Sequence, residues 1–337
     1  MGDTVGGEAP VATAIGLDVG GGALKAGVLL IDRHGTPFPD GAPRTVDHGL
    51  GADGPALVAL CARTARDLAA DLERRWPTLP PAWGVSAAAW IDPRTGESVF
   101  SPHLPGWRGR QLPAELSREL SRATGRPLSP DGGARPSPGS VATPSVVNDA
   151  DAAAWAEARL AAAPAGADRP DRMVLVAIGT GIGGALVQDG AVDLGAHGMA
   201  GEYGHMTVDP SRGPCPCGNS GCWELLVSAA ALARRAGDES ARQVLDRALS
   251  GDRRSLEAVR QTGRWLGRGL ATLAAVLDPS RFVIGGGLSV AGDLLLEPAR
   301  AELLRHLPGG RHRPVPGVAA AALGNDAGWS GAAGIAL

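Results

Sequence analysis

The sequence predicts an α/β protein built from two similar halves. Residues 14–31 and residues 173–191 share one plan, in which a glycine-rich turn joins two apolar strands. Stretches with helical spacing of apolar residues follow each of these hairpins. The length of 337 residues also exceeds what a single hydrophobic core usually serves. We therefore expect an internally duplicated fold of two domains, with a cleft between the halves.

Composition and charge exclude several classes of protein. Hydrophobic residues make up 44% of the chain and charged residues 20%, which is typical of a globular protein in water. The net charge of -3 gives no electrostatic reason to bind nucleic acid. No basic residue precedes Lys25 and no apolar signal core follows the start, so we expect no signal peptide. No run is long enough to span a bilayer. A cytoplasmic location, without a nucleic acid or membrane partner, is the prediction.

The first hairpin contains the glycine-rich turn DVGGGALK between strands at 14–17 and 26–31. Glycines allow backbone N–H groups to approach a phosphate closely. Asp18, at the end of the first strand, could hold Mg²⁺ through water. The spacing differs from the P-loop pattern, which needs GxxxxGK followed by Ser or Thr. Taken alone, this is a weak signal for a phosphate site, because glycine-rich hairpins are more often ordinary turns.

Further elements of the first half follow from periodicity and turn residues. The apolar pattern predicts helices over 55–75 and 112–125 and a strand over 83–91. Residues 101–109 are expected to form a loop, and the Pro-, Gly- and Ser-rich stretch 128–144 a surface loop.

A short strand over 145–147 delivers Asn148 and Asp149 to the start of a helix over 151–163. An aspartate at such a junction is commonly an N-cap. It can also be a general base, because α/β active sites form at the carboxyl ends of strands. Considered in isolation, the cap is the more common case for Asp149 or Asp151.

In the second half, the turn GTGIGG carries Thr180, whose hydroxyl can join backbone amides at a phosphate. Residues 225–278 are expected to be helical throughout. A buried strand over 281–284 then leads through a third glycine-rich turn into a helix, whose N-terminus could face an adenosine or a phosphate. A Gly- and Ala-rich helix from residue 323 onward closes the chain.

The stretch 201–224 holds three of the four cysteines together with one histidine. Three thiolates and one imidazole form a complete tetrahedral set for Zn²⁺, and turn formers between them let the loop fold back. A pair of inert thiols or a disulfide would need only two cysteines, and a Cys-x-Cys pair is too cramped to bridge comfortably. With four protein ligands the site has no open position, so we expect a structural clip that positions the flanking glutamates. Cys61, the fourth cysteine, is expected in the core. The predicted ligands are His205, Cys215, Cys217 and Cys222.

The whole of this stretch, GEYGHMTVDPSRGPCPCGNSGCWE, resembles the GExGH and CxCGxxGCxE elements of ROK-family sugar kinases, which are bacterial glucokinase-like members of the actin/hexokinase-type ATPases. DVGGGALK and AIGTGIGGAL are similar to the two phosphate motifs of that family. VVNDADAAAWAE is similar to its catalytic-aspartate motif, and FVIGGGLS to its adenosine motif. The resemblance covers residues 14–337, with order and spacing in agreement.

The resemblance implies two actin-like (ribonuclease H-like) α/β domains with the active site in a cleft between them. The smaller domain would span 12–145 and be completed by the C-terminal helix 323–337. The larger would span 146–322 and contain the zinc loop 201–224. It also implies ATP-dependent phosphorylation of a hexose, usually at the C6 hydroxyl, with glucose and a role in glycolysis as the leading case. A dimer or tetramer would be usual for the family.

Site roles carried over from the family divide into four groups. Asp149 is the general base. Sugar hydroxyls would be bound by Asn148, Glu202, His205, Glu224, Ala89 and His103. The nucleotide and Mg²⁺ would lie at Asp18, Gly20, Gly21, Gly22, Thr180, Gly181, Gly285 and Gly286. His205 would serve both zinc and sugar, beside the three cysteine ligands.

Five positions depart from the family pattern. Gly22 and Ala23 replace a common Thr-Lys pair, which removes a hydroxyl that usually faces the phosphates. Ala89 stands where a glycine beside the sugar is usual, and His103 where an asparagine is common. Asp151 replaces a frequent asparagine, and a second carboxylate facing Asp149 would raise the pKa of the base.

Other functions compete with the hexose kinase. A catalytically weak, sugar-sensing ROK protein is one alternative, and a kinase for N-acetylmannosamine, mannose, fructose or allose is another. ROK repressors carry a DNA-binding segment before the first phosphate motif; only about a dozen residues precede it here, so this reading is disfavoured. Polyphosphate as the donor is also disfavoured, because no basic tract runs through the glycine-rich motifs.

Overall fold

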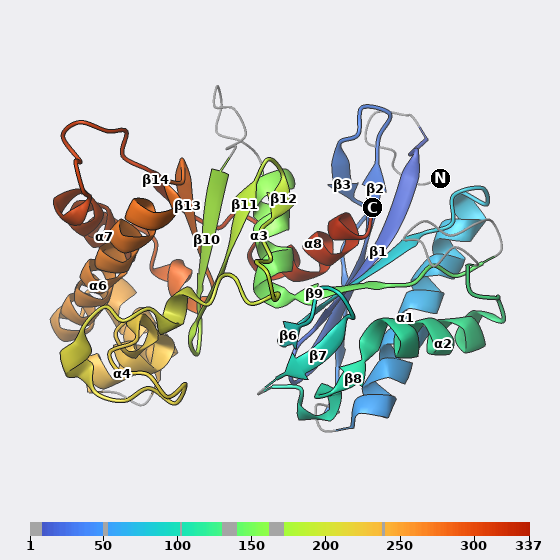
Figure 1. The fold of residues 1–337 in the computed structure, drawn as a ribbon, viewed down its shortest axis with the longest axis horizontal. Helices are drawn as coiled ribbons and strands as arrows, with labels where there is room; N and C mark the ends of the chain where they lie inside the picture. The colour runs from blue at the N-terminus through green and yellow to red at the C-terminus, as the bar shows by residue number, and fades with distance from the viewer. Residues whose placement is uncertain (1–8, 50–52, 102, 130–139, 162–171, 238–239) are drawn as a thin grey trace. The chain divides into compact units, whose positions relative to one another are not determined.

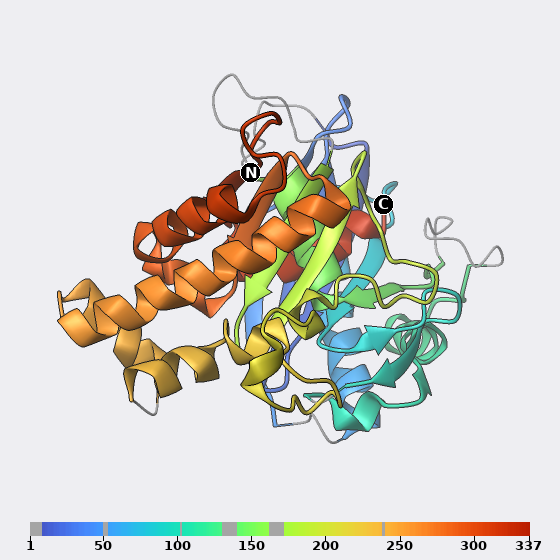
Figure 2. The same cartoon turned by 60° about the vertical axis from the view of Figure 1, so that its left-hand side comes forward.

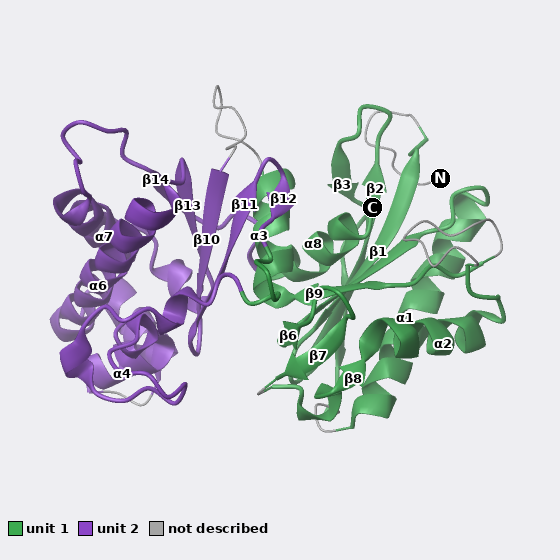
Figure 3. Cartoon of the chain, in the orientation of Figure 1, with its two compact units in different colours: residues 1–162, 194–199, 325–337 green, residues 163–193, 200–324 purple. Residues whose placement is uncertain are grey.

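In the computed structural model, residues 9–49, 53–101, 103–129, 140–161, 172–237 and 240–337 are described. The chain divides into two compact units (Figure 3). Unit 1 comprises Met1–Ala162, Leu194–Met199 and Asn325–Leu337, and unit 2 comprises Ala163–Asp193 and Ala200–Gly324. The sequence analysis expected the second domain to begin at residue 146. Unit 2 begins later in the chain, at Ala163, because the strand and the helix that follow residue 144 pair and pack with the other elements of unit 1.

The main sheet of unit 1 has the order β3-β2-β1-β5-β9, with β4 also paired to β2 (Figure 1). β1 and β2 form the predicted antiparallel hairpin, while β5 and β9 run parallel to β1. The expected strand over 83–91 is split, since β5 ends before Trp90. The strands are β1 (Ala12–Val19), β2 (Ala23–Ile31), β3 (Pro37–Pro39), β4 (Arg44–Asp47), β5 (Ala82–Ala87) and β9 (Ser145–Asn148).

Helices cover both faces of this sheet because its strands are apolar on both sides. Alternate residues such as Ile15 and Leu17 pack with α1 (Gly54–Arg75) and α2 (Leu112–Thr124) in one core. Ala14 and its neighbours on the opposite face pack with α8 (Ala327–Ile335). α3 (Asp149–Arg159) lies against α8 (Figure 1). Both predicted helices of the first half are confirmed.

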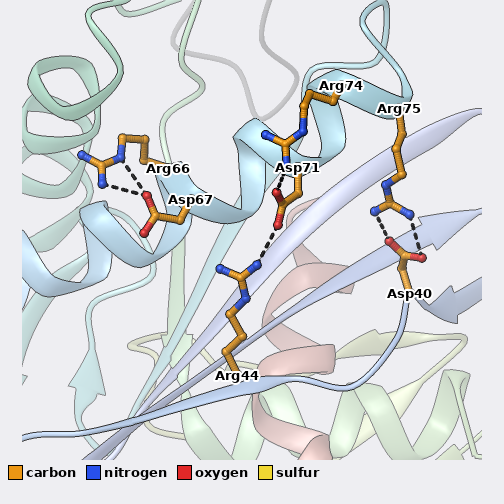
Figure 4. Close-up of polar contacts among 7 residues, drawn as sticks. All are labelled: Asp40, Arg44, Arg66, Asp67, Asp71, Arg74 and Arg75. Atoms are coloured by element: carbon orange, nitrogen blue, oxygen red, sulfur yellow. Dashed lines mark hydrogen bonds and ion pairs between the residues drawn. The ribbon is translucent and has the colours of Figure 1, made fainter. Parts of the chain in front are cut away.

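The exposed side of α1 is tied to the sheet edge by ion pairs (Figure 4). Arg44 of β4 reaches Asp71 at 2.6 Å, and Arg75 pairs with Asp40. Arg66 and Asp67 pair within the helix at 2.7 Å. Such exposed pairs each contribute about 0–1 kcal/mol, so the buried face of α1 dominates its stability.

A small antiparallel sheet, which the sequence analysis did not anticipate, lies between β5 and α2. It consists of β6 (Trp90–Ile91), β7 (Glu97–Phe100) and β8 (Arg110–Gln111), in that order. The expected loop 101–109 contains a single 3-10 turn, η1 (Pro105–Trp107). Most of the expected loop 128–144 lies outside the described residues.

Unit 2 repeats the plan of unit 1. Its sheet has the order β12-β11-β10-β13-β14, in which β10 and β11 form an antiparallel hairpin and β13 and β14 run parallel to β10. The predicted internal duplication is therefore confirmed at the level of sheet topology. The strands are β10 (Arg172–Ile178), β11 (Ile182–Gln188), β12 (Ala191–Val192), β13 (Arg281–Gly285) and β14 (Gly317–Ala320).

The expectation of continuous helix over 225–278 is wrong. The stretch begins with a 3-10 turn and then forms α4 (Ala229–Ala236), α5 (Ala241–Leu249) and α6 (Arg253–Leu277). α4 ends at Gly237, whose φ of 68° is left-handed, and Gly251 with φ 92° separates α5 from α6. Glycine adopts this conformation without steric cost, so it stops a helix where the apolar periodicity continues.

The longest helix, α6, lies side by side with α7 (Asp293–His306), as both views show (Figures 1 and 2). Phe282 and Ile284 of β13 pack in the same core as these two helices. A 3-10 turn, η5 (Gly287–Ala291), joins β13 to α7. Among the helices that the structure describes, none combines the length and apolar character needed to cross a bilayer.

Candidate functional site

The four predicted metal ligands converge in unit 2. Their ligand atoms all lie within 4.8 Å of one another. The sulfurs of Cys217 and Cys222 are 3.6 Å apart, and the sulfur of Cys215 lies 4.0 Å from Nδ1 of His205. Tetrahedral zinc with sulfur at about 2.3 Å separates its ligand atoms by about 3.5–3.8 Å. Both the chemistry of the donors and their spacing therefore fit a structural Zn²⁺.

Local backbone pairing brings these side chains together. Bridges between Thr207 and Cys222 and between Pro214 and Ser220 fold the loop back on itself. Gly221 has φ 72°, and a Cβ there would stand 2.4 Å from the carbonyl oxygen of Asp209. Only glycine fits at this crossing, which explains why a glycine directly precedes Cys222.

The two ring nitrogens of His205 face different groups. Nδ1 faces Cys215 and lies 3.5 Å from the Glu224 carboxylate, whereas Nε2 lies 3.6 Å from Glu202. A ligating histidine commonly directs its second nitrogen to a carboxylate, which fixes the ring orientation. His205, the three cysteines and the two glutamates thus form one side-chain assembly within unit 2.

Thiol protonation in this loop is set by burial and by a backbone amide. Burial raises the pKa of Cys215 to about 12, while the N–H of Asn219 lowers the pKa of Cys217. A coordinating dication removes the thiol proton outright. The buried, high-pKa position of Cys215 is therefore compatible with a metal ligand.

One glycine-rich turn of unit 2 borders this assembly, and the other packs against the end of β10. A Cβ at Gly181 would lie 2.7 Å from Oε2 of Glu224, so the carboxylate rests against the turn between β10 and β11. Gly286, with φ 78°, packs so closely that a Cβ would meet the carbonyl oxygen of Ile178 at 2.4 Å. Thr180 is exposed and Gly285 is buried. Close backbone approach at 178–181 and 285–286 is what a phosphate-binding surface needs.

In unit 1, Asp18 ends β1 beside Ser86 of β5. The Ser86 hydroxyl donates to Oδ1 of Asp18 over 2.6 Å. Burial raises the pKa of the Asp18 carboxyl, while the Ser86 hydrogen bond and the charge of Lys25 act in the opposite direction. Lys25 pairs with Asp326 at 2.8 Å. A largely buried carboxylate at a strand end, beside exposed glycines, is a candidate for holding a hydrated cation.

The glycine turn between β1 and β2 is open. Gly21 and Gly22 are exposed, and a Cβ at Gly22 would meet no described atom within 4 Å. Gly20 is partly buried and donates its N–H to Ala23 over 3.0 Å. The carbonyl oxygen of His103 would lie 3.2 Å from a Cβ at Gly21, so the 101–109 loop borders this turn.

Asn148 takes the capping role that the sequence analysis considered for Asp149 or Asp151. Its side-chain oxygen accepts from the N–H of Ala150 at 2.8 Å, and its amide donates to the carbonyl of Ala89 at 3.0 Å. Asp149 is exposed, with Oδ1 accepting from the N–H of Ala150 at 2.9 Å. Asp151 is buried, so the two carboxylates occupy different environments.

Two predicted sugar contacts differ in exposure. Ala89 is only 3% exposed, so its methyl group belongs to the core and its carbonyl is already bonded to Asn148. His103 is exposed. The sequence analysis missed Ser86, Lys25 and Asp326. The signal for Ser86 was its place on β5 opposite Asp18, which only the strand register reveals.

Comparisons with known proteins point to one family. The ROK family matches residues 142–337. The chain is 32% identical to a glucokinase of Streptomyces coelicolor, with 96% of each chain covered. An N-acetylmannosamine kinase of Salmonella heidelberg is 37% identical over 194 residues, which is 56% of this chain and 62% of that protein.

A crystal structure of a ROK family glucokinase from Streptomyces griseus in complex with glucose and AMPPNP is also similar. It is 29% identical, with a TM-score of 0.68 that covers 96% of this chain and 99% of the other. This match confirms the predicted fold class, a pair of actin-like α/β domains, for the two units. On the family match, the overall identity and the shared fold, the chain belongs to the ROK family.

Proposed function

We propose that the protein is an ATP-dependent hexose kinase that converts glucose to glucose 6-phosphate. The observations that support the proposal are an exposed carboxylate at a strand end of unit 1, Asp149, and two glutamates of unit 2, Glu202 and Glu224, that lie against His205 of the cysteine cluster. The glucokinases among its relatives, similar over nearly their full length, support the choice of sugar.

Asp149 is the proposed general base. A sugar hydroxyl is a poor nucleophile, and a carboxylate within hydrogen-bonding reach accepts its proton as the bond to phosphorus forms. The exposed carboxylate follows directly on β9, at the carboxyl end of a parallel strand, where α/β folds place reacting groups. The Ala150 N–H holds one oxygen in place, which restricts the orientation of the carboxylate.

Glu202, Glu224 and Nε2 of His205 are the proposed partners of sugar hydroxyls. Carboxylates accept from paired hydroxyls, and a site built to bond a hydroxyl discriminates strongly against analogues that lack it. The second amide hydrogen of Asn148 and the exposed His103 are further candidates. The backbone amides at 20–22, 179–181 and 285–286, with Thr180, would bind the nucleotide phosphates.

ATP with Mg²⁺, when bound, supplies the transferred phosphoryl group and neutralises its developing charge. Asp18 would hold the hydrated cation, and Lys25 lies opposite it in the β1–β2 register. Zn²⁺ is proposed as a structural ion at His205, Cys215, Cys217 and Cys222. A cytoplasmic location and a dimeric or tetrameric state stay predictions from the sequence.

The test is ADP formation from ATP by the purified protein with glucose, mannose, fructose, N-acetylmannosamine, N-acetylglucosamine and allose. We expect turnover only with sugar and the highest kcat/KM for glucose. If kcat/KM is highest for N-acetylmannosamine, the proposed substrate is wrong, whereas the proposed kinase activity stands. No turnover with any sugar would contradict the kinase and favour a sugar sensor.

A substitution at the base sharpens the test. Asp149→Asn should lower kcat by about 10²–10⁴-fold, because the amide cannot accept the hydroxyl proton. Asp67→Asn, on the exposed side of α1, is the matched control and should keep wild-type kcat. Circular dichroism should show both variants folded. An active Asp149→Asn enzyme would remove Asp149 from the mechanism.

A further inference from the structure

We propose that Trp223 is a positioning residue. It anchors the metal loop (residues 201–224) against α6 and thereby sets the location of the Glu224 carboxylate. The inference rests on the proposed function, because it assigns Glu224 to the sugar. Trp223 stands between Cys222, a proposed zinc ligand, and Glu224. Its side chain is fully buried. Along the chain, a proposed zinc ligand and the proposed sugar contact therefore lie on either side of this residue.

Two directed contacts hold the Trp223 indole. Its Nε1–H donates to the carbonyl oxygen of Trp265 in α6 over 2.9 Å. A helical carbonyl has a second lone pair, so it can accept this bond without giving up its helical one. The backbone N–H of Trp223 also donates to the carbonyl of Met206 over 2.8 Å, next to His205. The segment next to His205 and the segment next to Cys222 are thus both held at Trp223.

The surface of α6 is shaped to receive the ring. A Cβ at Gly269 would stand 2.1 Å from Cε2 and 2.3 Å from Cζ2 of Trp223, so the indole occupies the space that a side chain would need. Trp265 lies one helical turn before Gly269. The guanidinium of Arg268 is 4.6 Å from the centroid of the Trp265 ring, and the guanidinium of Arg212, from the metal loop, is 6.0 Å from the same centroid. The loop therefore meets α6 at Trp265 through both Trp223 and Arg212.

Glu224 has little freedom once Trp223 is fixed. Its Oε1 lies 3.2 Å from the sulfur of Cys215, and its Oε2 borders Gly181. A displacement of the indole by the size of one methyl group would move the adjacent backbone. Displacements of about 1 Å at a reacting or binding group commonly cost about 10²-fold in rate. Sugar binding should therefore depend on the fit between Trp223 and Gly269.

Gly269→Ala and Gly267→Ala form a matched pair for the test. Both add one methyl group to α6, two residues apart. The first would clash with Trp223, whereas the second would meet the carbonyl oxygen of Ala299 in α7 at 2.3 Å. Trp223→Phe is the third variant, since it keeps an aromatic ring and removes only the N–H donor and part of the ring volume. Sugar KM, ATP KM, zinc content and Tm are measured for each.

We expect Gly269→Ala and Trp223→Phe to raise the sugar KM by about tenfold or more, with ATP KM and zinc content unchanged. Gly267→Ala should lower Tm and leave the sugar KM at the wild-type value. An equal effect of the two glycine variants on the sugar KM, or a wild-type KM in Trp223→Phe, would overturn the inference. If the wild-type protein turns over no hexose, the proposed kinase function is wrong. The role of Trp223 is then tested on its own by calorimetric measurement of sugar affinity in the same variants.

Discussion

Asp18 is a carboxyl group that the fold keeps largely buried, although its ionised form is more stable in water. Burial at the end of β1 raises the pKa of its carboxyl, although the Ser86 hydroxyl and Lys25 lower it in part. A group whose folded pKa lies above its unfolded value of 3.8 stabilises the protein at low pH. That contribution is lost as the pH rises from about 3.8 through the raised folded pKa. At neutral pH the buried Asp18 carboxyl therefore lowers the stability of the apo protein.

Asp18→Asn should raise the Tm of the apo protein at pH 7, because the neutral amide keeps the shape and removes the buried charge. The same change should weaken ATP-dependent turnover if Asp18 holds the hydrated cation. Thermal melts between pH 3 and pH 8 check the sign, since the advantage of the variant should vanish toward low pH. A variant less stable than wild type at pH 7 would show that the Ser86 and Lys25 contacts outweigh the burial.

At the scale of elements, α8 is seated on the unit 1 sheet through glycines. Cβ atoms at Gly16 and Gly84 would each lie 1.8 Å from a carbonyl oxygen of α8, and one at Gly27 would lie 2.6 Å from the Trp329 ring. The backbone of α8 thus approaches the strands more closely than any side chain would permit. A helix from the end of the chain therefore covers one face of a sheet that residues 12–31 begin.

Gly84→Ala should destabilise the protein by about 1–3 kcal/mol or more, because the new methyl group overlaps the carbonyl of Ala332 and α8 must shift. Denaturant unfolding measures the change. Gly49→Ala serves as the control, since its Cβ would meet no described atom within 4 Å. Equal stabilities of the two variants would mean that α8 does not bear on the sheet as described.

The metal loop holds the four proposed zinc ligands, which the sequence already predicts. Cys217→Ser should drop the zinc content well below the expected value of about one equivalent per chain. Since Cys217 is exposed, the change removes a ligand without opening a cavity. Cys61→Ala, in the core, should keep the metal. Elemental analysis decides, and zinc retained by Cys217→Ser would refute the four-ligand site.

For the whole molecule, the two units have separate hydrophobic cores. One cluster contains Ile15, Leu17 and the buried face of α1, and the other contains Phe282, Ile284 and the buried faces of α6 and α7. The four proposed zinc ligands lie in unit 2. The stability of each unit can therefore be perturbed from within that unit.

Calorimetry should resolve two thermal transitions, since a chain with two cores need not unfold as one cooperative unit. A zinc chelator should lower the midpoint of one transition, because a structural metal contributes its binding free energy to the fold around it. Gly84→Ala should lower the other. If both perturbations shift one common transition, the units unfold together.

The residue pattern alone predicted the clustering of three cysteines with one histidine, the two hairpins, the order of the motifs and the aspartate at the strand end. These depend on residue type and short-range spacing, which fix donor chemistry and local backbone geometry. Only the tertiary structure decided the rest. Strand register brought Ser86 to Asp18, and helix breaks at Gly237 and Gly251 interrupted a continuous apolar pattern. Asn148, rather than an aspartate, became the cap, and Trp223 met Gly269 across 46 positions of the chain. Such contacts depend on which faces of distant elements meet, and periodicity along the chain carries no information about that.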